Sequence, residues 1–328
     1  MGCNNCIVGN LIVDVKVTGE GNMTAMPSLM SFIQAEDIQQ NSEEYILRME
    51  EADAVDFADF SGDHLDRTQI FYKVPDKDWD VIEGIYDLSE HKWIDDVIKK
   101  RLVTCHYQPI VTDNGDVYAY EMLARFYNEE GETIFPGEIF GAAKERGRLY
   151  ALDRLCRMTA VRHSVNLKDK LAFINFIPTS IYNPEFCLRS TTALATQLSV
   201  DPRQLVFEVV ETEQVKDVEH LKSILNYYRS KGFQYALDDV GEGFSTMTML
   251  QDIKPNYMKL DMKYVQGVAD DESKQKVAKQ FLTQARKDRA VPLAEGIEEE
   301  EDFEWLKKEG YQLFQGYMFG KPSPEVIA

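Results

Sequence analysis

Acidic residues close several short apolar runs of this sequence. Residues 207–211, 236–239 and 258–261 each combine apolar side chains with carboxylates, and Glu121 and Glu295 follow apolar residues in the same way. A carboxylate in an apolar interior is costly unless a cation or hydrogen-bond donors compensate it. One divalent cation compensates several carboxylates at once, so the pattern predicts a metal site built from strand ends.

The elements that must position these residues are strands. From about Leu102 onward, apolar runs alternate with segments of helical periodicity. The runs predicted as strands are residues 103–111, 117–126, 171–177, 205–211, 234–239, 257–261, 291–294 and 311–314. The segments predicted as helices are residues 136–146, 152–165, 218–230, 274–286 and 299–309. Eight strands separated in this way fit one closed barrel.

The first two runs differ from the rest because only a short turn separates them. Asn114-Gly115 in that turn is typical of a tight hairpin, which makes the two strands antiparallel. We therefore predict a TIM-like (β/α)8 barrel with one antiparallel strand, formed by residues 101–328.

Polar residues lie where these strands end. They are Glu121, Asn175, Glu208, Asp238, Asp239, Lys259, Glu295 and Gln315. Oxygen donors with one amine are the chemistry of a hard-cation site, and no histidine has ligand spacing at a strand end, which argues against an imidazole zinc site. Adjacent Asp238 and Asp239 can converge at a frayed strand end. A carboxylate there can bridge two cations about 3.5–4 Å apart, an arrangement suited to phosphoryl transfer.

Composition excludes several classes of protein. A net charge of −20 over 328 residues disfavours nucleic-acid polymers and anionic membrane surfaces as partners. No run approaches the roughly 20 apolar residues that cross a bilayer, and the start lacks a signal-peptide pattern, so we expect a cytoplasmic protein. Five cysteines form an odd, sparse set that implies no disulfide scaffold.

Residues 1–100 follow a different pattern. We predict a small helical or mixed accessory region with a mobile acidic part, because the segment from Glu36 to Arg67 contains eleven Asp or Glu and only two Arg. Cys3 and Cys6 have the spacing of zinc and redox pairs, and Cys105-His106 could complete a zinc site in space. Free thiols are the alternative, and the sequence assigns this region no role.

Several short motifs occur in a fixed order along the chain. They are Tyr107-Gln108-Pro109-Ile110, Glu121-Met122-Leu123-Ala124-Arg125, Asn175, Glu208-Val209-Val210-Glu211, Asp238-Asp239-Val240-Gly241-Glu242-Gly243, Lys259-Leu260-Asp261, Glu295-Gly296-Ile297-Glu298 and Gln315-Gly316-Tyr317. The series resembles that of the EAL-domain cyclic di-GMP phosphodiesterases over residues 102–322. Met122 replaces the alanine of the Glu-Ala-Leu signature, and Val240 and Glu242 depart from the usual loop after the paired aspartates.

The resemblance implies hydrolysis of cyclic di-GMP to linear pGpG with two Mg²⁺ or Mn²⁺ ions and inhibition by Ca²⁺. It implies a first metal held by Glu121, Asn175, Glu208 and Asp238, and a second held by Asp238, Asp239 and Glu295. Lys259 would orient or deprotonate the attacking water, so Lys259 and Glu121 are the expected catalytic residues. The expected substrate contacts are Gln108, Leu123, Arg125 and Gln315.

Three further residues are expected beside the site. Glu211 would order a loop. Asp261 would either tie a loop or lie next to the site, and Glu298 would either begin a helix or support Lys259 or the loop. The resemblance also implies a homodimer that contacts through the loop at residues 241–243, where Val240 and Glu242 depart from the pattern.

Three functional hypotheses follow. The first is an active phosphodiesterase, which the complete ligand set favours. The second is a catalytically silent EAL domain that serves as a cyclic di-GMP receptor or protein-interaction module. The third is an active enzyme that its N-terminal region holds off until a signal arrives.

Overall fold

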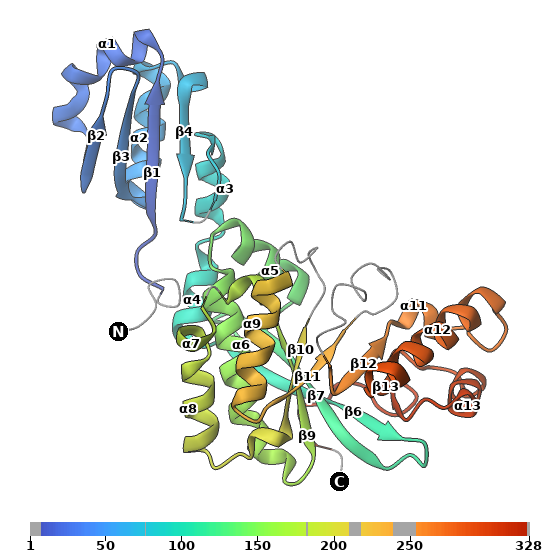
Figure 1. Ribbon diagram of the computed structural model, residues 1–328. Helices are drawn as coiled ribbons and strands as arrows, with labels where there is room; N and C mark the ends of the chain where they lie inside the picture. The colour runs from blue at the N-terminus through green and yellow to red at the C-terminus, as the bar shows by residue number, and fades with distance from the viewer. Residues whose placement is uncertain (1–7, 76, 182, 210–217, 239–253, 327–328) are drawn as a thin grey trace. The chain divides into compact units, whose positions relative to one another are not determined.

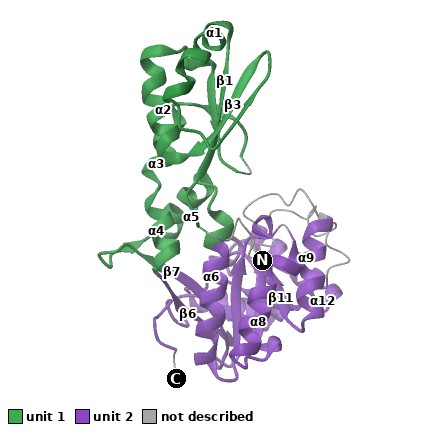
Figure 2. Ribbon diagram, turned by 90° about the vertical axis from the view of Figure 1, so that its left-hand side faces the viewer, with its two compact units in different colours: residues 1–102, 126–152 green, residues 103–125, 153–328 purple. Residues whose placement is uncertain are grey.

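The computed structural model describes residues 8–326 except 76, 182, 210–217 and 239–253. The chain divides into two compact units (Figure 2). The first contains Met1–Leu102 and Phe126–Leu152, and the second contains Val103–Arg125 and Asp153–Ala328. A domain boundary near residue 100 stays a prediction, since residues 126–152 group with the first unit. No described helix has the length and apolar character of a membrane span.

The second unit is a closed barrel (Figure 1). Its strands form a ring in the order β6-β14-β13-β12-β11-β10-β9-β7, and β7 pairs back with β6. Strand β6 is antiparallel to β14. Going round the ring from β7 through β9 to β14, each strand is parallel to the next. The predicted barrel with one reversed strand is confirmed. The strands are β6 (Val103–Thr112), β7 (Val117–Tyr127), β9 (Leu171–Phe176), β10 (Leu205–Val209), β11 (Gln234–Leu237), β12 (Tyr257–Leu260), β13 (Val291–Ala294) and β14 (Leu313–Gln315).

Helices surround this ring. They are α6 (Leu149–His163), α7 (Pro184–Cys187), α8 (Arg189–Gln197), α9 (Val218–Ser230), α11 (Met262–Val265), α12 (Glu272–Asp288) and α13 (Glu300–Glu309), with short 3₁₀ turns at Ser164–Leu167, Pro178–Ser180 and Pro202–Gln204. Sequence periodicity predicts α6, α9, α12 and α13. It misses α7 and α8. Helix α7 is a single turn that begins at Pro184 directly after the Asn183 cap, and α8 carries few apolar residues.

The first unit is an antiparallel sheet with helices. Its sheet has the order β2-β3-β1-β4-β5. The first six elements run β1-α1-β2-β3-α2-β4, which with this strand order is the split βαβ, ferredoxin-like topology. This confirms a mixed N-terminal region. The elements are β1 (Ile12–Thr18), α1 (Glu20–Leu29), a 3₁₀ turn at Met30–Phe32, β2 (Asp37–Gln40), β3 (Glu44–Glu50), α2 (Glu51–His64), a 3₁₀ turn at Arg67–Gln69, β4 (Ile70–Lys73), β5 (Asp80–Val81), α3 (Gly84–Glu90), α4 (Trp93–Lys100), β8 (Thr133–Ile134) and α5 (Pro136–Glu145).

Candidate active site

One buried residue from each barrel strand forms a layer in the barrel interior. The layer consists of Ile110, Ala119, Phe173, Val206, Ala236, Tyr257, Leu293 and Leu313. Because side chains on a strand repeat with a period of two, the residue two places along points to the same interior. Two places toward the carboxyl end of each parallel strand lie Glu121, Asn175, Glu208, Asp238, Lys259, Glu295 and Gln315, and two places back along reversed β6 lies Gln108. The strand period alone therefore brings eight polar side chains to one rim.

Lys259 is the centre of the charged part of this rim. Its Nζ lies 2.7 Å from Glu208 Oε1, 3.2 Å from Asp238 Oδ1 and 2.6 Å from Glu295 Oε1. The side chains of Lys259 and Glu208 are 1% and 0% exposed, so water does not screen this cluster. The structure thus gathers on one ammonium three carboxylates that come from three different strand ends.

Glu121 is held by two amides. Asn175 Nδ2 donates to Glu121 Oε1 at 2.8 Å, and Gln315 Nε2 donates to Glu121 Oε2 at 2.6 Å. Both donors come from distant positions in the chain, and Glu121 and Gln315 are buried. The two bonds fix the plane of the carboxylate toward the interior of the barrel.

The charges of the cluster do not balance. Burial raises the pKa of Glu208 well above its usual range, and burial followed by the neighbouring Asp238 does the same for the pKa of Glu295. Burial by itself lowers the pKa of Lys259, but Asp238, Glu208, Glu295 and Glu121 outweigh it and hold that pKa well above the usual value. Without cations Lys259 is therefore an ammonium ion rather than a base, and its four carboxylate neighbours exceed its charge.

Oxygen donors in this rim fit divalent cations. Glu208 Oε2 and Gln315 Oε1 are buried, and neither accepts a hydrogen bond from a described residue. Unpaired buried oxygens next to excess carboxylates are the donor set that Mg²⁺ and Mn²⁺ bind. Within the described ranges, no three acidic, His or Cys side chains already surround one point at ligand distance, since the carboxylates turn toward Lys259 and the amides.

Two glycines allow the strand ends to carry these residues. Gly296, directly after Glu295, has φ +72°, and a Cβ there would lie 2.4 Å from Met262 Cβ. A Cβ on Gly316, directly after Gln315, would lie 1.9 Å from the carbonyl oxygen of Ile297. Any larger residue would separate these segments, so the glycines of both motifs have a packing role that spacing alone does not indicate.

Buried Asp153 positions the segment that follows Asn175. Its Oδ1 accepts from the Ile177 amide at 2.9 Å, and its Oδ2 accepts from Ser180 Oγ at 2.7 Å. Arg157 also donates to Asp153 from one helical turn further on. Strand-end patterns do not indicate this pair; the signal that does is an Asp and an Arg four positions apart on an amphipathic helix.

The remaining predicted residues have separate environments. Gln108 is buried, and its Nε2 is 3.5 Å from the Gly320 carbonyl oxygen. Leu123 and Arg125 are half-buried on β7, and Arg125 Nη1 donates to the Ala124 carbonyl at 2.9 Å. Asp261 ties a loop, because it accepts from the Lys263 amide at 2.6 Å and caps α11.

Glu298 does not join the cluster, and several other predicted residues lie outside the described part of the chain. Exposed Glu298 precedes the Glu299 cap of α13 and contacts Gln266 Nε2 at 3.4 Å. Asp239, Glu211, Val240 and Glu242 lie outside the described residues, as do Cys3 and Cys6. Cys105 is a buried free thiol whose pKa burial raises to about 12, which makes it a poor metal ligand.

Comparisons with known proteins agree with this geometry. The model of the EAL domain family matches residues 91–322. The curated Escherichia coli K12 protein named cyclic di-GMP phosphodiesterase PdeF is 28% identical over 66% of this chain, which spans 29% of that protein. A standalone EAL protein from Vibrio cholerae O395, solved in its c-di-GMP-bound form, is 34% identical with a TM-score of 0.59 and covers 67% of this chain and 92% of its own. The PaMucR phosphodiesterase in complex with c-di-GMP is 25% identical with a TM-score of 0.62, over 68% of this chain and 98% of its own.

Proposed function

Because the chain belongs to the EAL domain family, we propose that it is a cytoplasmic phosphodiesterase that hydrolyses cyclic di-GMP to linear pGpG and so lowers this second messenger. The single observation that carries the proposal is the polar rim of the barrel, where three carboxylates contact one buried ammonium and two amides hold a fourth carboxylate. The relatives described above, which include a cyclic di-GMP phosphodiesterase and two c-di-GMP complexes, support the choice of substrate.

Two Mg²⁺ or Mn²⁺ ions would be held by this rim. The expected ligands are Glu121, Asn175, Glu208, Asp238, Asp239 and Glu295, with Asp238 shared between the two ions. Such ions supply charge stabilisation for the attacking and the leaving oxygens of a phosphodiester. Ca²⁺ would inhibit, because its longer and looser coordination does not hold those oxygens in the same geometry.

Lys259 would act on the attacking water through Nζ. The barrel buries this atom among the carboxylates, away from solvent. Whether Lys259 is protonated therefore depends on the charge of those carboxylates. Burial alone lowers the pKa of this amine. Once metal ions neutralise the carboxylates, Lys259 would therefore be able to orient the water or accept its proton.

Substrate contacts would come from the same rim. Arg125 would meet a phosphate of the substrate, and Gln108, Leu123 and Gln315 would lie next to the substrate or its water. We also propose that two copies of the chain form a homodimer.

Purified full-length protein, cyclic di-GMP and either Mg²⁺ or Mn²⁺ provide the direct test. We expect chromatography to show pGpG with either ion and no product after chelation. Binding of cyclic di-GMP without any pGpG under both conditions would overturn the phosphodiesterase proposal.

The second candidate is a catalytically silent cyclic di-GMP receptor. One observation favours it: Lys259 and two amides already satisfy much of the carboxylate cluster without a cation. A receptor would bind cyclic di-GMP in Ca²⁺ or chelator with the same affinity as in Mg²⁺. The enzyme would instead need Mg²⁺ or Mn²⁺ for turnover and be inhibited by Ca²⁺.

A further inference from the structure

The sheet of the first unit has one face covered by helices and one face left open. Val13, Val15 and Val17 on β1 are fully buried and pack with residues of α1, α2 and α3. Their alternate neighbours on β1 are only half-buried. Figure 2 shows α2 and α3 on one side of β1 and β3. The open face belongs to none of the described buried clusters.

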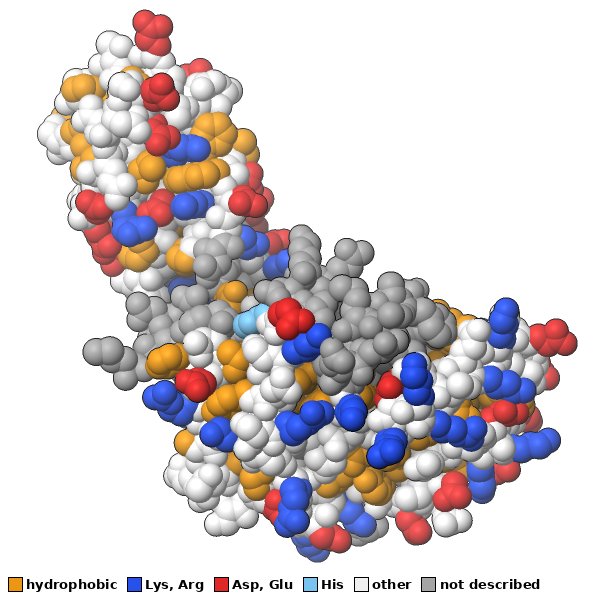
Figure 3. All heavy atoms as spheres, in the orientation of Figure 1, with side chains coloured by type: hydrophobic (Ala, Val, Ile, Leu, Met, Phe, Trp, Pro, Cys, Tyr) orange, Lys and Arg blue, Asp and Glu red, His pale blue; other side chains and the backbone are white. Residues whose placement is uncertain are grey.

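Two aromatic rings and two lysines meet on this open face. Lys16 is the cross-strand partner of Phe71, and Lys73 is the partner of Asp14. Lys16 Nζ lies 5.2 Å from the Phe71 ring centroid and 4.5 Å from that of Trp79, and Lys73 Nζ lies 4.9 Å from the Trp79 ring centroid. Trp79 thus has two ammonium groups within cation–π distance. Figure 3 shows this unit from the same side as Figure 1, with hydrophobic and basic side chains interleaved.

The charge of this cluster is opposite to that of its surroundings. Residues 1–102 contain 21 Asp and Glu and nine Lys and Arg. One acid on this face, Asp14, is bound to Arg48 at 2.8 and 3.1 Å. Neither Lys16 nor Lys73 forms an ion pair with another described residue. The two ammonium groups are therefore available to an anion.

We propose that this cluster, formed by Lys16, Phe71, Lys73 and Trp79, binds a nucleotide. A nucleotide has a planar base, which the aromatic rings can stack on, and phosphates, which the two ammonium groups can bind. Aromatic side chains stack on bases of any type, and lysine binds phosphate as a point charge. The open sheet of RNA-recognition motifs uses its aromatics in this way. A long polyanion does not fit, because the acidic remainder of the unit repels it. The proposal is independent of the barrel chemistry.

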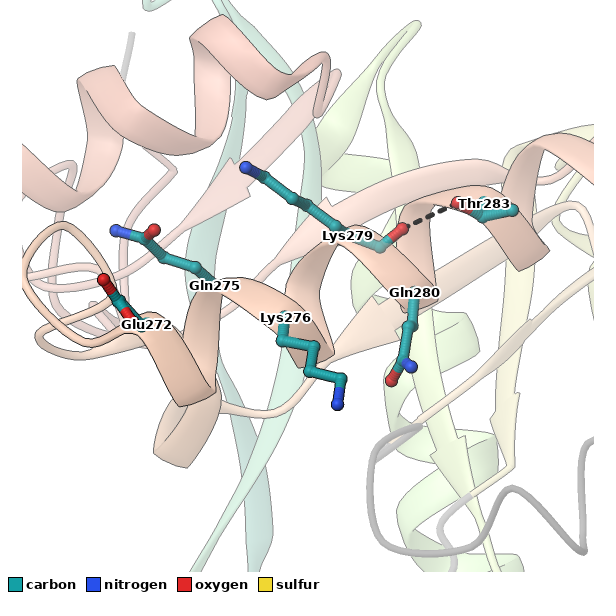
Figure 4. Close-up of a pocket in the computed structure, with 6 residues that line it drawn as sticks. All are labelled: Glu272, Gln275, Lys276, Lys279, Gln280 and Thr283. Atoms are coloured by element: carbon teal, nitrogen blue, oxygen red, sulfur yellow. Dashed lines mark hydrogen bonds between the residues drawn. The ribbon is translucent and has the colours of Figure 1, made fainter.

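A second lysine–tryptophan pair in the chain lacks these properties and supplies the control. Lys279 Nζ lies 5.4 Å from the Trp305 ring centroid but also 3.4 Å from Glu309 Oε1. It lines a shallow hollow along α12 together with Glu272, Gln275, Lys276, Gln280 and Thr283 (Figure 4). The ammonium group of Lys279 is therefore already paired with the carboxylate of Glu309.

The test is equilibrium binding of ATP and of GTP to the full-length chain in EDTA, which removes cation-dependent binding at the barrel. We expect binding that weakens about tenfold or more in Lys16→Gln with Lys73→Gln and in Trp79→Leu, but not in Lys279→Gln. Trp79→Phe should retain much of the affinity, because it keeps a ring. Inorganic triphosphate should bind about tenfold less tightly than ATP, because it has no ring to stack.

Several outcomes would overturn the proposal. They are the absence of ATP and GTP binding at millimolar concentration, equal binding by the lysine double variant, and equal binding of inorganic triphosphate. Binding of polyglutamate as tight as that of ATP would assign the face to acidic peptides instead. Circular dichroism and thermal melting check that each variant is folded, and the single variant Lys73→Gln repeats the test if the double variant is not.

Discussion

Two buried ion clusters in this chain combine basic side chains with carboxylates but differ in charge balance. In the barrel, Lys259 alone faces Glu208, Asp238 and Glu295. In the first unit, Arg146 donates to Glu51 at 2.6 and 2.7 Å and to Asp95 at 2.9 Å. Arg148 adds a bond of 2.8 Å to Asp95, so two cations face two carboxylates.

The balance determines the proton state of each cluster. Burial tends to raise the pKa of Asp95, but hydrogen bonds from Arg146 and Arg148 outweigh it and lower that pKa. Among the described residues of the barrel no second cation does this, and the pKa values of Glu208 and Glu295 rise well above their usual range. The balanced cluster is complete within the protein, whereas the unbalanced one favours added cations or protons.

The largest expected effect is loss of hydrolysis when the unbalanced cluster loses a carboxylate. Asp238→Ala and Glu121→Ala each remove metal affinity, so pGpG should fall below detection in the chromatographic assay. The exposed Asp201→Ala is the control and should leave the rate unchanged. Full activity of either site variant at saturating Mn²⁺ would contradict the assignment.

Removing the ammonium group that contacts the carboxylate cluster should slow chemistry more than binding. Lys259→Ala is expected to lower turnover by about 10²–10⁴-fold, the usual contribution of a positioned acid or base. Affinity for cyclic di-GMP, measured in Ca²⁺ to prevent turnover, should change little. A variant that loses binding but keeps its turnover number would show that Lys259 only holds the substrate.

The balanced cluster should respond through stability instead. Arg146→Leu leaves Glu51 without its arginine in a buried environment, which costs about 3–5 kcal/mol of unfolding free energy. Urea unfolding of the full chain measures it. Adding Glu51→Leu to Arg146→Leu should recover part of the loss. Substitution of the exposed Arg203 by Leu is the matched control and should have no measurable effect. An equal loss of stability in both arginine variants would show that the buried cluster contributes no more than a surface ion pair.

Added cations should stabilise only the unbalanced cluster. Mn²⁺ at about 100 times its dissociation constant stabilises a one-site protein by about 2.7 kcal/mol. We expect a corresponding rise of the melting temperature in the wild type and in Arg146→Leu, but not in Asp238→Ala. An identical rise in all three proteins would place the cation elsewhere.

The smallest expected effect is on the stability of the folded protein at acidic pH. Because the folded pKa of Asp95 is lowered, its contribution is present above the unfolded pKa of about 3.9 and is lost as the pH falls through the folded pKa. Asp95→Asn should therefore flatten the acid limb of the stability curve below about pH 4. Melting temperatures between pH 2 and 7 test this, and an unchanged acid limb would assign the acid sensitivity to other carboxylates.

Much of the barrel follows from local patterns. Apolar runs at strand length and the Asn114-Gly115 turn predict the barrel strands and the reversed one, because strand period and turn chemistry are properties of neighbouring residues. The ferredoxin-like order of the first unit is not predicted. Its acidic helix α2 buries Glu51, Ser61 and two alanines, with Phe57 as the one large apolar side chain, so the amphipathic signal is weak.

The sequence by itself determined which residues reach the rim. Each one lies two places from an interior residue of its strand, and that period is built into an extended chain. Only the tertiary structure decided which side chains meet there. Gln315 reaches Glu121 across 194 positions, and Arg146 reaches Glu51 across 95. Charge balance depends on such distant neighbours, so whether a buried carboxylate is neutralised by the protein or left for a cation became visible only when the strands closed into a barrel.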